Sequence, residues 1–257
     1  MPFADVGSDR LYYAERGRGA ATSRGWPLVF VHGAAGSHLV WGQQVRALGE
    51  ITHAVALDLP GHGRSRMPGR DSIENYRDVV LGLLDMLGFK RAVIVGHSMG
   101  GAIAQSLALS HPNRVAGLGL VGTGARLRVL PAISDGVQND LANTARLVVE
   151  YSYAPTLDAA MRERAVAEFL ACPAAVTYGD FSACNQFDVM ARLSEIHAPA
   201  LVVCGEQDRM TPVKYSEFLS SHIPNTRLAL VQGAGHSVMI EQPEAVNQAL
   251  SDFMRTL

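Results

Sequence analysis

The chain has 257 residues, of which 48% are hydrophobic, so it is long enough to form one sizeable core within a single domain. Its 22 Lys and Arg residues nearly balance its 24 Asp and Glu residues, and the formal net charge is −2. Nucleic-acid-binding proteins carry a basic surface and disordered chains an acidic, aromatic-poor composition, and this chain resembles neither. We therefore expect a small-molecule partner and no nucleic acid, whereas the oligomeric state cannot be inferred.

The ends and the cysteines of the chain bear on its location. The first ten residues, MPFADVGSDR, contain acidic side chains and no apolar stretch, unlike a secretory signal. A run of about eighteen apolar residues, as a membrane span requires, is absent from the sequence. Cys172, Cys184 and Cys204 are too few for a disulfide framework, and Cys204 lies within an apolar run, as a buried cysteine would. The prediction is a cytoplasmic protein without a membrane partner.

Short apolar runs alternate with segments of helical period. In chain order the pattern predicts strands at 27–31 and 54–57, a helix at 72–87, a strand at 92–95, a helix at 99–109, strands at 115–121, 200–204 and 228–231, and a helix at 245–254. The strand runs are continuously apolar, so each is predicted to be buried on both faces of a parallel sheet. Asp71 and Glu74 predict a capping box at the start of the first helix. This alternation indicates a doubly wound α/β fold with right-handed crossovers.

One segment, 124–193, has helical patterns but no strand. We expect it to be a helical cap over the carboxyl edge of the sheet, where open α/β sheets bind ligands, with 1–123 and 194–257 forming the core. Within it, Asn185 and Phe187 are candidate substrate contacts. The alternative is that Asn185 or Gln186 caps the start of a helix while Phe187 is buried.

The strongest local signal is Gly96-His97-Ser98-Met99-Gly100. It follows a predicted strand and precedes an Ala-rich helix, which is the context of a nucleophile elbow. Glycines on either side allow the sharp turn that exposes the serine hydroxyl at a helix N-terminus. Ser98 is therefore the predicted nucleophile.

A serine hydroxyl needs an adjacent base to become a strong nucleophile. His236 follows the strand at 228–231 through a glycine-rich turn, and is the predicted general base. The acid that orients it should lie between serine and histidine in the sequence. Asp208, after the strand at 200–204, is the candidate, and Glu206 is the alternative.

Backbone N–H groups should stabilise the oxyanion. The loop His32-Gly33-Ala34-Ala35-Gly36 leaves a central strand beside the elbow, and the amides of Ala34 and Met99 are the best candidates. His32 is expected to fix this loop, and 58–65 (DLPGHGRS) is expected to be structural.

Taken in order, HG-x-x-G, D-x-P-G-x-G-x-S, GHSMG, G-x-x-D-x-x-T-P and G-x-G-H resemble the α/β-hydrolase superfamily. Within it, they resemble the capped esterase, enol-lactonase and C–C-bond-hydrolase group, over 28–257 except for the cap. The resemblance implies an eight-stranded, mostly parallel sheet and catalysis without a metal or an organic cofactor. It places Ser98, Asp208 and His236 on the triad positions, and Ala34 and Met99 on the oxyanion positions.

The function expected is hydrolysis of a small to medium carboxylic ester through an acyl-enzyme on Ser98. An enol-lactonase or a C–C bond hydrolase with the same triad is an alternative, and Arg126 and Arg128 would then hold a substrate carboxylate or else be solvated. A non-catalytic ligand-binding relative is the alternative from another class. The GLGLVG run at 117–122 matches a dinucleotide-binding pattern, but it begins within a predicted strand and no helix follows at once.

Overall fold

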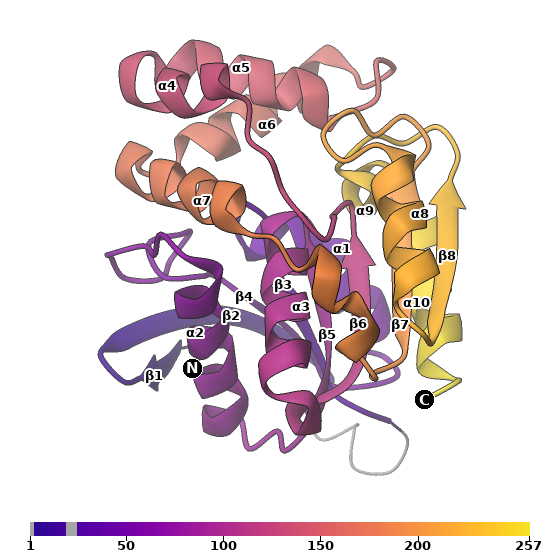
Figure 1. Cartoon of the computed structure of the whole chain (residues 1–257). Helices are drawn as coiled ribbons and strands as arrows, with labels where there is room; N and C mark the ends of the chain where they lie inside the picture. The colour runs from indigo at the N-terminus through magenta and orange to yellow at the C-terminus, as the bar shows by residue number, and fades with distance from the viewer. Residues whose placement is uncertain (1–2, 19–24) are drawn as a thin grey trace.

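The computed structural model describes residues 3–18 and 25–257, which form an eight-stranded sheet in the order β1-β2-β4-β3-β5-β6-β7-β8 (Figure 1). β2 is antiparallel to β1 and β4, and the remaining neighbours are parallel. The α/β-hydrolase fold predicted from the sequence is thus confirmed. The strands are β1 (Phe3–Val6), β2 (Asp9–Arg16), β3 (Leu28–Val31), β4 (Ala54–Leu57), β5 (Ala92–His97), β6 (Val115–Val121), β7 (Ala200–Gly205) and β8 (Thr226–Val231).

Helices cover both faces of the sheet, and alternate strand residues enter separate apolar clusters. In β3, Val29 and Val31 belong to the cluster on one face, whereas Leu28 and Phe30 belong to the cluster on the other. Both faces of the central strands are therefore covered, and the ends of these strands remain for a site. One face carries α2 (Ile73–Met86), α3 (Met99–Ser110) and α8 (Val213–His222). The other face carries α1 (Gly42–Leu48), α9 (Val238–Glu241) and α10 (Pro243–Met254). Three short 3-10 helices of the described residues are η2 (His38–Trp41), η3 (Pro112–Arg114) and η4 (Met190–Glu195).

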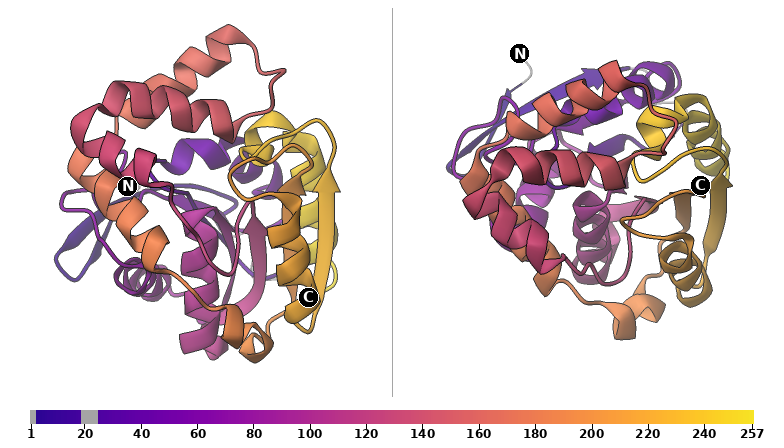
Figure 2. Two further views of the ribbon diagram at one scale, coloured as in Figure 1. Left: turned by 45° about the horizontal axis from the view of Figure 1, so that its top comes forward. Right: turned by 90° about the horizontal axis from the view of Figure 1, so that it is seen from above.

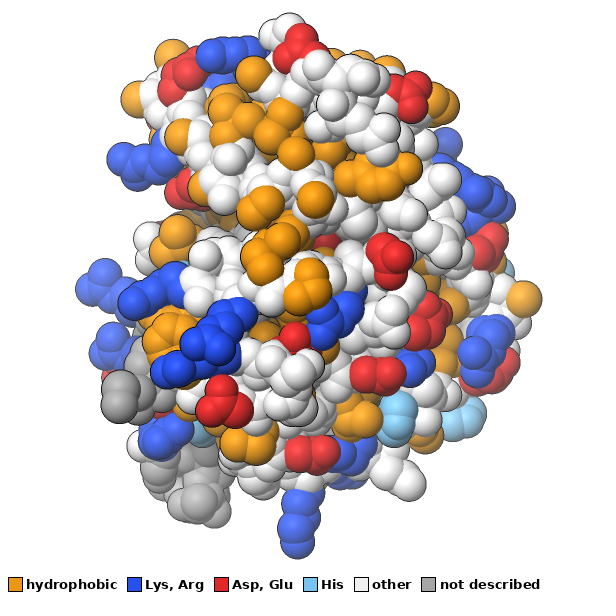
Figure 3. All heavy atoms as spheres, turned by 90° about the vertical axis from the view of Figure 1, so that its left-hand side faces the viewer, with side chains coloured by type: hydrophobic (Ala, Val, Ile, Leu, Met, Phe, Trp, Pro, Cys, Tyr) orange, Lys and Arg blue, Asp and Glu red, His pale blue; other side chains and the backbone are white. Residues whose placement is uncertain are grey.

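Four α-helices between β6 and β7 lie over one end of the sheet (Figure 2). They are α4 (Pro131–Asn139), α5 (Leu141–Ser152), α6 (Ala159–Leu170) and α7 (Ala174–Gln186), and we call them the α4–α7 segment. A third apolar cluster joins them to the loop after β3, through residues such as Phe169, Phe181 and Ala35. Seen from the side, hydrophobic side chains are numerous over this segment, while acidic and basic side chains are interspersed below it (Figure 3). The segment falls within 124–193, and its being a separate domain stays a prediction.

Two local predictions were wrong. The last strand is not buried on both faces, because β8 lies at the edge of the sheet and leaves Leu228 and Leu230 36% and 43% exposed. The cap of α2 is Ser72 rather than Asp71, since the Ser72 hydroxyl accepts from the backbone N–H of Asn75. Extended backbone at Ser72 brings its short side chain to that amide, one position later than predicted.

Candidate active site

Ser98 lies at the turn between β5 and α3, with φ 51° and ψ −115°. This is a strained backbone for a residue with a Cβ, and such strain persists only where the surroundings enforce it. Here the chain packs too closely for side chains: a Cβ on Gly96 would overlap the carbonyl of Gly100, and one on Gly100 would overlap the carbonyl of Val31. The elbow predicted from the two glycines is therefore present, with the serine at its tip.

Asp208 and His236 come together from the turns that follow β7 and β8. His236 Nδ1 and Asp208 Oδ2 are 2.9 Å apart, and both side chains are buried. Asp208 Oδ1 accepts from the amides of Met210 and Thr211, each at 2.8 Å, and Oδ2 accepts from the Thr211 hydroxyl at 2.9 Å. Burial would raise the pKa of Asp208, but the charge of His236 and these donors hold that pKa below its usual range. The carboxylate is thus fixed in place and ionised, while the Glu206 side chain is exposed to solvent.

His97 contacts both the main chain and the ring of His236. Its Nε2 lies 3.1 Å from the main-chain oxygen of His236, and the two rings pack with centroids 4.7 Å apart. Burial, and then the neighbouring His236, lowers the pKa of His97 to about 3, so the ring is neutral and donates to that carbonyl. Sequence reasoning missed this contact, because the residue beside the nucleophile in a G-x-S-x-G motif carries no pattern of its own.

The two backbone amides predicted to stabilise the oxyanion are on the loop after β3 and at the start of α3. Ala34 borders the same cavity as Ser98, and Met99 is the first residue of α3. Within 3–18 and 25–257, neither backbone N–H donates to a protein acceptor. His32 fixes the loop as expected: its Nε2 accepts from the amide of Leu59 at 3.0 Å, and its Nδ1 lies 2.8 Å from the oxygen of Gly33.

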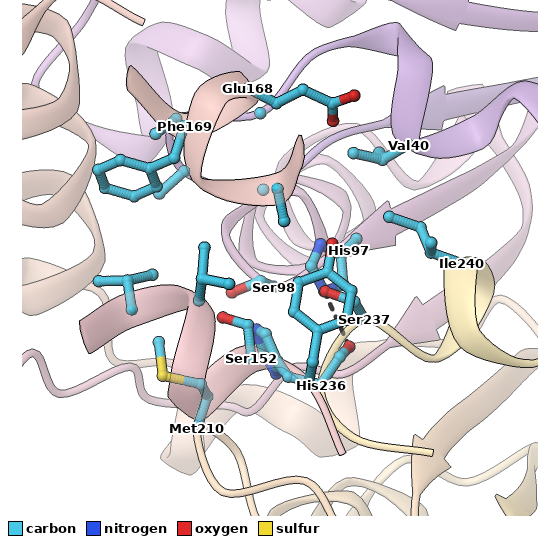
Figure 4. Close-up of a pocket in the computed structure, with 18 of the residues that line it drawn as sticks. Val40, His97, Ser98, Ser152, Glu168, Phe169, Met210, His236, Ser237 and Ile240 are labelled. Atoms are coloured by element: carbon cyan, nitrogen blue, oxygen red, sulfur yellow. Dashed lines mark hydrogen bonds between the residues drawn. The ribbon is translucent and has the colours of Figure 1, made fainter. Parts of the chain in front are cut away.

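A cavity of about 110 Å³ lies between the ends of the central strands and the α4–α7 segment. Ser98 and His236 both border this cavity, and in Figure 4 Glu168 lies on the opposite side from them. A smaller space of about 60 Å³ adjoins it and shares Ala34, Ser98, Phe181, Met210 and His236. The larger space is mostly apolar, with walls that include Val40, Val148, Val149, Tyr153, Phe169 and Ile240, and the smaller one is bordered by Arg126, Arg128 and Tyr215.

The described residues include one group that offers metal-ligating atoms: His62, Cys172 and Asp180, whose atoms lie within 4.8 Å of one another. All three side chains are buried. The Asp180 oxygens already accept from His62, from Tyr76 and from a backbone amide. This set fits a hydrogen-bonded pair better than a metal site, because both His62 nitrogens face oxygen atoms and three donors already contact the Asp180 oxygens.

A sequence model described as "alpha/beta hydrolase fold" matches residues 27–243, which is most of the chain. The chain belongs to the α/β-hydrolase family.

Relatives of this α/β hydrolase carry more than one activity in their names. A 2-hydroxy-6-oxononadienedioate/2-hydroxy-6-oxononatrienedioate hydrolase of Paraburkholderia phymatum is 32% identical, over 95% of this chain and 91% of that protein. A solved thermophilic esterase is 34% identical, with a TM-score of 0.85, over 99% of this chain and 96% of that one. The enol-lactonase of Burkholderia xenovorans LB400 has a TM-score of 0.91 at 24% identity, over 99% and 100% of the two chains, and shows the shared fold. These comparisons support a hydrolase.

The substrate contacts expected in this α/β hydrolase are not at its cavity. Asn185 is exposed near the end of α7, and Phe187 is buried in the core beneath that helix. The helix turns Phe181, one turn earlier than Asn185, toward the cavity instead. Phe181 was not distinguished from the other aromatic residues of 124–193, because helical period alone does not say which face of a helix meets the core. No helix among the described residues has the length and apolarity to cross a membrane.

Proposed function

We propose that this protein is a serine hydrolase that cleaves a carboxylic ester of a small to medium substrate through an acyl-enzyme on Ser98. One observation carries the proposal: the strained Ser98 borders the same cavity as His236, whose Nδ1 is held by the buried Asp208. A hydroxyl at a sharp turn, an imidazole and an orienting carboxylate are the components of nucleophilic acyl transfer.

The steps begin from the hydrogen bond between Asp208 and His236. Asp208 keeps the His236 proton on Nδ1, so Nε2 is free to accept the hydroxyl proton of Ser98 as its oxygen attacks the ester carbonyl. The amides of Ala34 and Met99 stabilise the tetrahedral oxyanion. His236 then protonates the leaving alcohol, and the acyl group remains on Ser98. Water, deprotonated by His236, attacks the acyl-enzyme, and the proton returns to Ser98 as the acid leaves.

The test is hydrolysis of p-nitrophenyl butyrate by the wild type, Ser98→Ala and Ser152→Ala. Ser152 also borders the cavity, so it is a matched control for loss of a hydroxyl there. We expect Ser98→Ala to lower turnover by a factor on the order of 10³ or more and Ser152→Ala to retain most of it. Equal effects of the two substitutions would contradict the assignment of Ser98.

A second candidate function is hydrolysis of a carboxylate-bearing lactone or of a C–C bond. The observation that favours it is the pair Arg126 and Arg128 beside the smaller space, since guanidinium groups bind carboxylates. Arg126 lies 3.7 Å from Asp188 and is 44% exposed, so it can also reach a ligand. If short esters are inert while a carboxylated lactone is cleaved, and Arg126→Gln raises KM for that lactone, the second candidate replaces the first. A folded wild type that is inert on both substrate classes would favour a ligand-binding protein.

A further inference from the structure

Asp180 is a fully buried carboxylate on α7, in contact with three donors from the core of the protein. Its Oδ2 accepts from the backbone N–H of Ala35 at 2.9 Å and lies 2.8 Å from His62 Nε2. Its Oδ1 accepts from the Tyr76 hydroxyl at 2.6 Å. One side chain of the α4–α7 segment thus joins the loop after β3, the turn after β4 and helix α2.

The bond to Ala35 matters because Ala35 follows the predicted oxyanion donor. Ala35 has φ 53°, a left-handed conformation that costs free energy for a residue with a Cβ. The peptide that carries the Ala35 N–H shares the Cα of Ala34 with the peptide that carries the Ala34 N–H. Fixing the first peptide by a charged acceptor therefore restricts the direction of the second, which borders the cavity beside Ser98.

The partner of the carboxylate is a protonated histidine. Both nitrogens of His62 face oxygen atoms, Nδ1 the carbonyl of Pro60 at 3.0 Å and Nε2 the carboxylate of Asp180. Burial opposes protonation, but the charge and hydrogen bond of Asp180 raise the pKa of His62 well above its usual value. Burial and Asp180 together also raise the pKa of Tyr76, so its hydroxyl remains a donor. The acceptor is thus fixed from two sides.

We propose that Asp180 is a positioning residue for the oxyanion hole: its carboxylate, anchored by His62 and Tyr76, holds Ala35 so that the Ala34 amide points at the reacting carbonyl. This inference rests on the proposed serine hydrolase. It also means that α7, which carries Phe181 on the cavity wall, fixes the substrate space and the oxyanion loop together.

The test compares Asp180→Ala with Glu163→Ala in p-nitrophenyl butyrate hydrolysis. Glu163 is an exposed carboxylate of the same segment, paired with Arg146, and is the matched control. Loss of a whole oxyanion donor lowers kcat by about 10²- to 10³-fold, so a displaced one is expected to lower kcat by roughly 10- to 100-fold. KM should stay within about threefold, because this contact forms in the transition state. Glu163→Ala should match the wild type.

Two further variants separate positioning from folding. Tyr76→Phe removes one anchor of the carboxylate but keeps the bond between Asp180 and Ala35, so its loss in kcat is expected to be smaller than that of Asp180→Ala. Asp180→Ala leaves three buried donors without an acceptor and so destabilises the fold. Each measured kcat is therefore divided by the fraction of the protein that is folded. Should it not fold, Asp180→Asn, which keeps one neutral oxygen, decides the question with an expected loss of about tenfold in kcat. Hydrogen exchange of the Ala35 amide should accelerate in either Asp180 variant.

The outcomes distinguish this inference from the proposed function. A wild type that neither hydrolyses esters nor reacts with a fluorophosphonate overturns both. An active wild type whose Asp180 variants keep kcat, or lose activity through KM alone, overturns the positioning role and leaves the serine hydrolase intact. Unchanged exchange at Ala35 also overturns it.

Discussion

Asp208→Asn is expected to lower kcat by a factor on the order of 10⁴, because the structure forces the new amide into one orientation. Asp208 Oδ1 accepts from the backbone amides of Met210 and Thr211, and those donors cannot become acceptors. The amide oxygen must therefore replace Oδ1, and the NH2 group replaces Oδ2 and faces His236 Nδ1. Nδ1 then has to accept, which moves the ring proton to Nε2, the nitrogen that should accept from Ser98. A 10⁴-fold loss corresponds to about 5.4 kcal/mol of transition-state stabilisation.

The assay is steady-state hydrolysis of p-nitrophenyl butyrate, with KM expected to change by less than about threefold. Glu206→Gln is the matched control, since it makes the same carboxyl-to-amide change in the same turn on an exposed side chain. It should retain wild-type kcat. A folded Asp208→Asn variant within tenfold of the wild type, or a larger loss for Glu206→Gln, would refute the assignment of the acid.

Two further predictions concern stability. Gly96→Ala should lower the free energy of unfolding by about 3 kcal/mol or more in urea titrations, because the new Cβ meets backbone atoms that cannot rotate away. Gly42 has open space around it, so Gly42→Ala should be neutral or stabilising. Equal stability of the two variants would contradict the packing at the elbow. Burial is the main cause that lowers the pKa of His32 to about 4 and the pKa of His97 to about 3. In the unfolded chain a histidine has a pKa of about 6.5, so below that pH the unfolded state binds two protons that the folded state excludes. The unfolding equilibrium constant should therefore rise by roughly tenfold per pH unit for each histidine as pH falls from 6.5 to about 4, and His97→Asn should remove one of the two contributions. An unchanged pH slope in that variant would show that His97 is not buried neutral.

The elements that the sequence predicted are those with strong local signals. Continuous apolar runs located β3, β4, β5, β6 and β7, since a strand covered on both faces is apolar at every position. β1 and β2 were not predicted, because as an antiparallel pair at the edge of the sheet they mix polar and apolar residues. The exposed face of β8 was not predicted for a related reason. Its polar and apolar residues alternate only weakly, and this face is exposed because the strand lies at the edge of the sheet.

The candidate site divides in the same way. Ser98, Asp208 and His236 follow strand ends and turns that the chain marks with glycines, so the sequence alone is enough to predict their convergence. The cavity walls could not be predicted, since they depend on how the α4–α7 segment packs, and α7, which carries Phe181, has almost no amphipathic pattern. The role of Asp180 was not predicted either, because its three donors come from 145, 118 and 104 residues earlier in the chain.

Peptide mapping by mass spectrometry, after treatment of the folded wild type with a fluorophosphonate, tests the identity of the nucleophile itself. We expect one covalent adduct, on Ser98, and none in Ser98→Ala. Labelling should also be strongly slowed in Asp208→Asn, where His236 cannot take the proton. An adduct on another residue such as Ser152, or no adduct at all on the folded wild type, would contradict the assignment of Ser98 as the nucleophile.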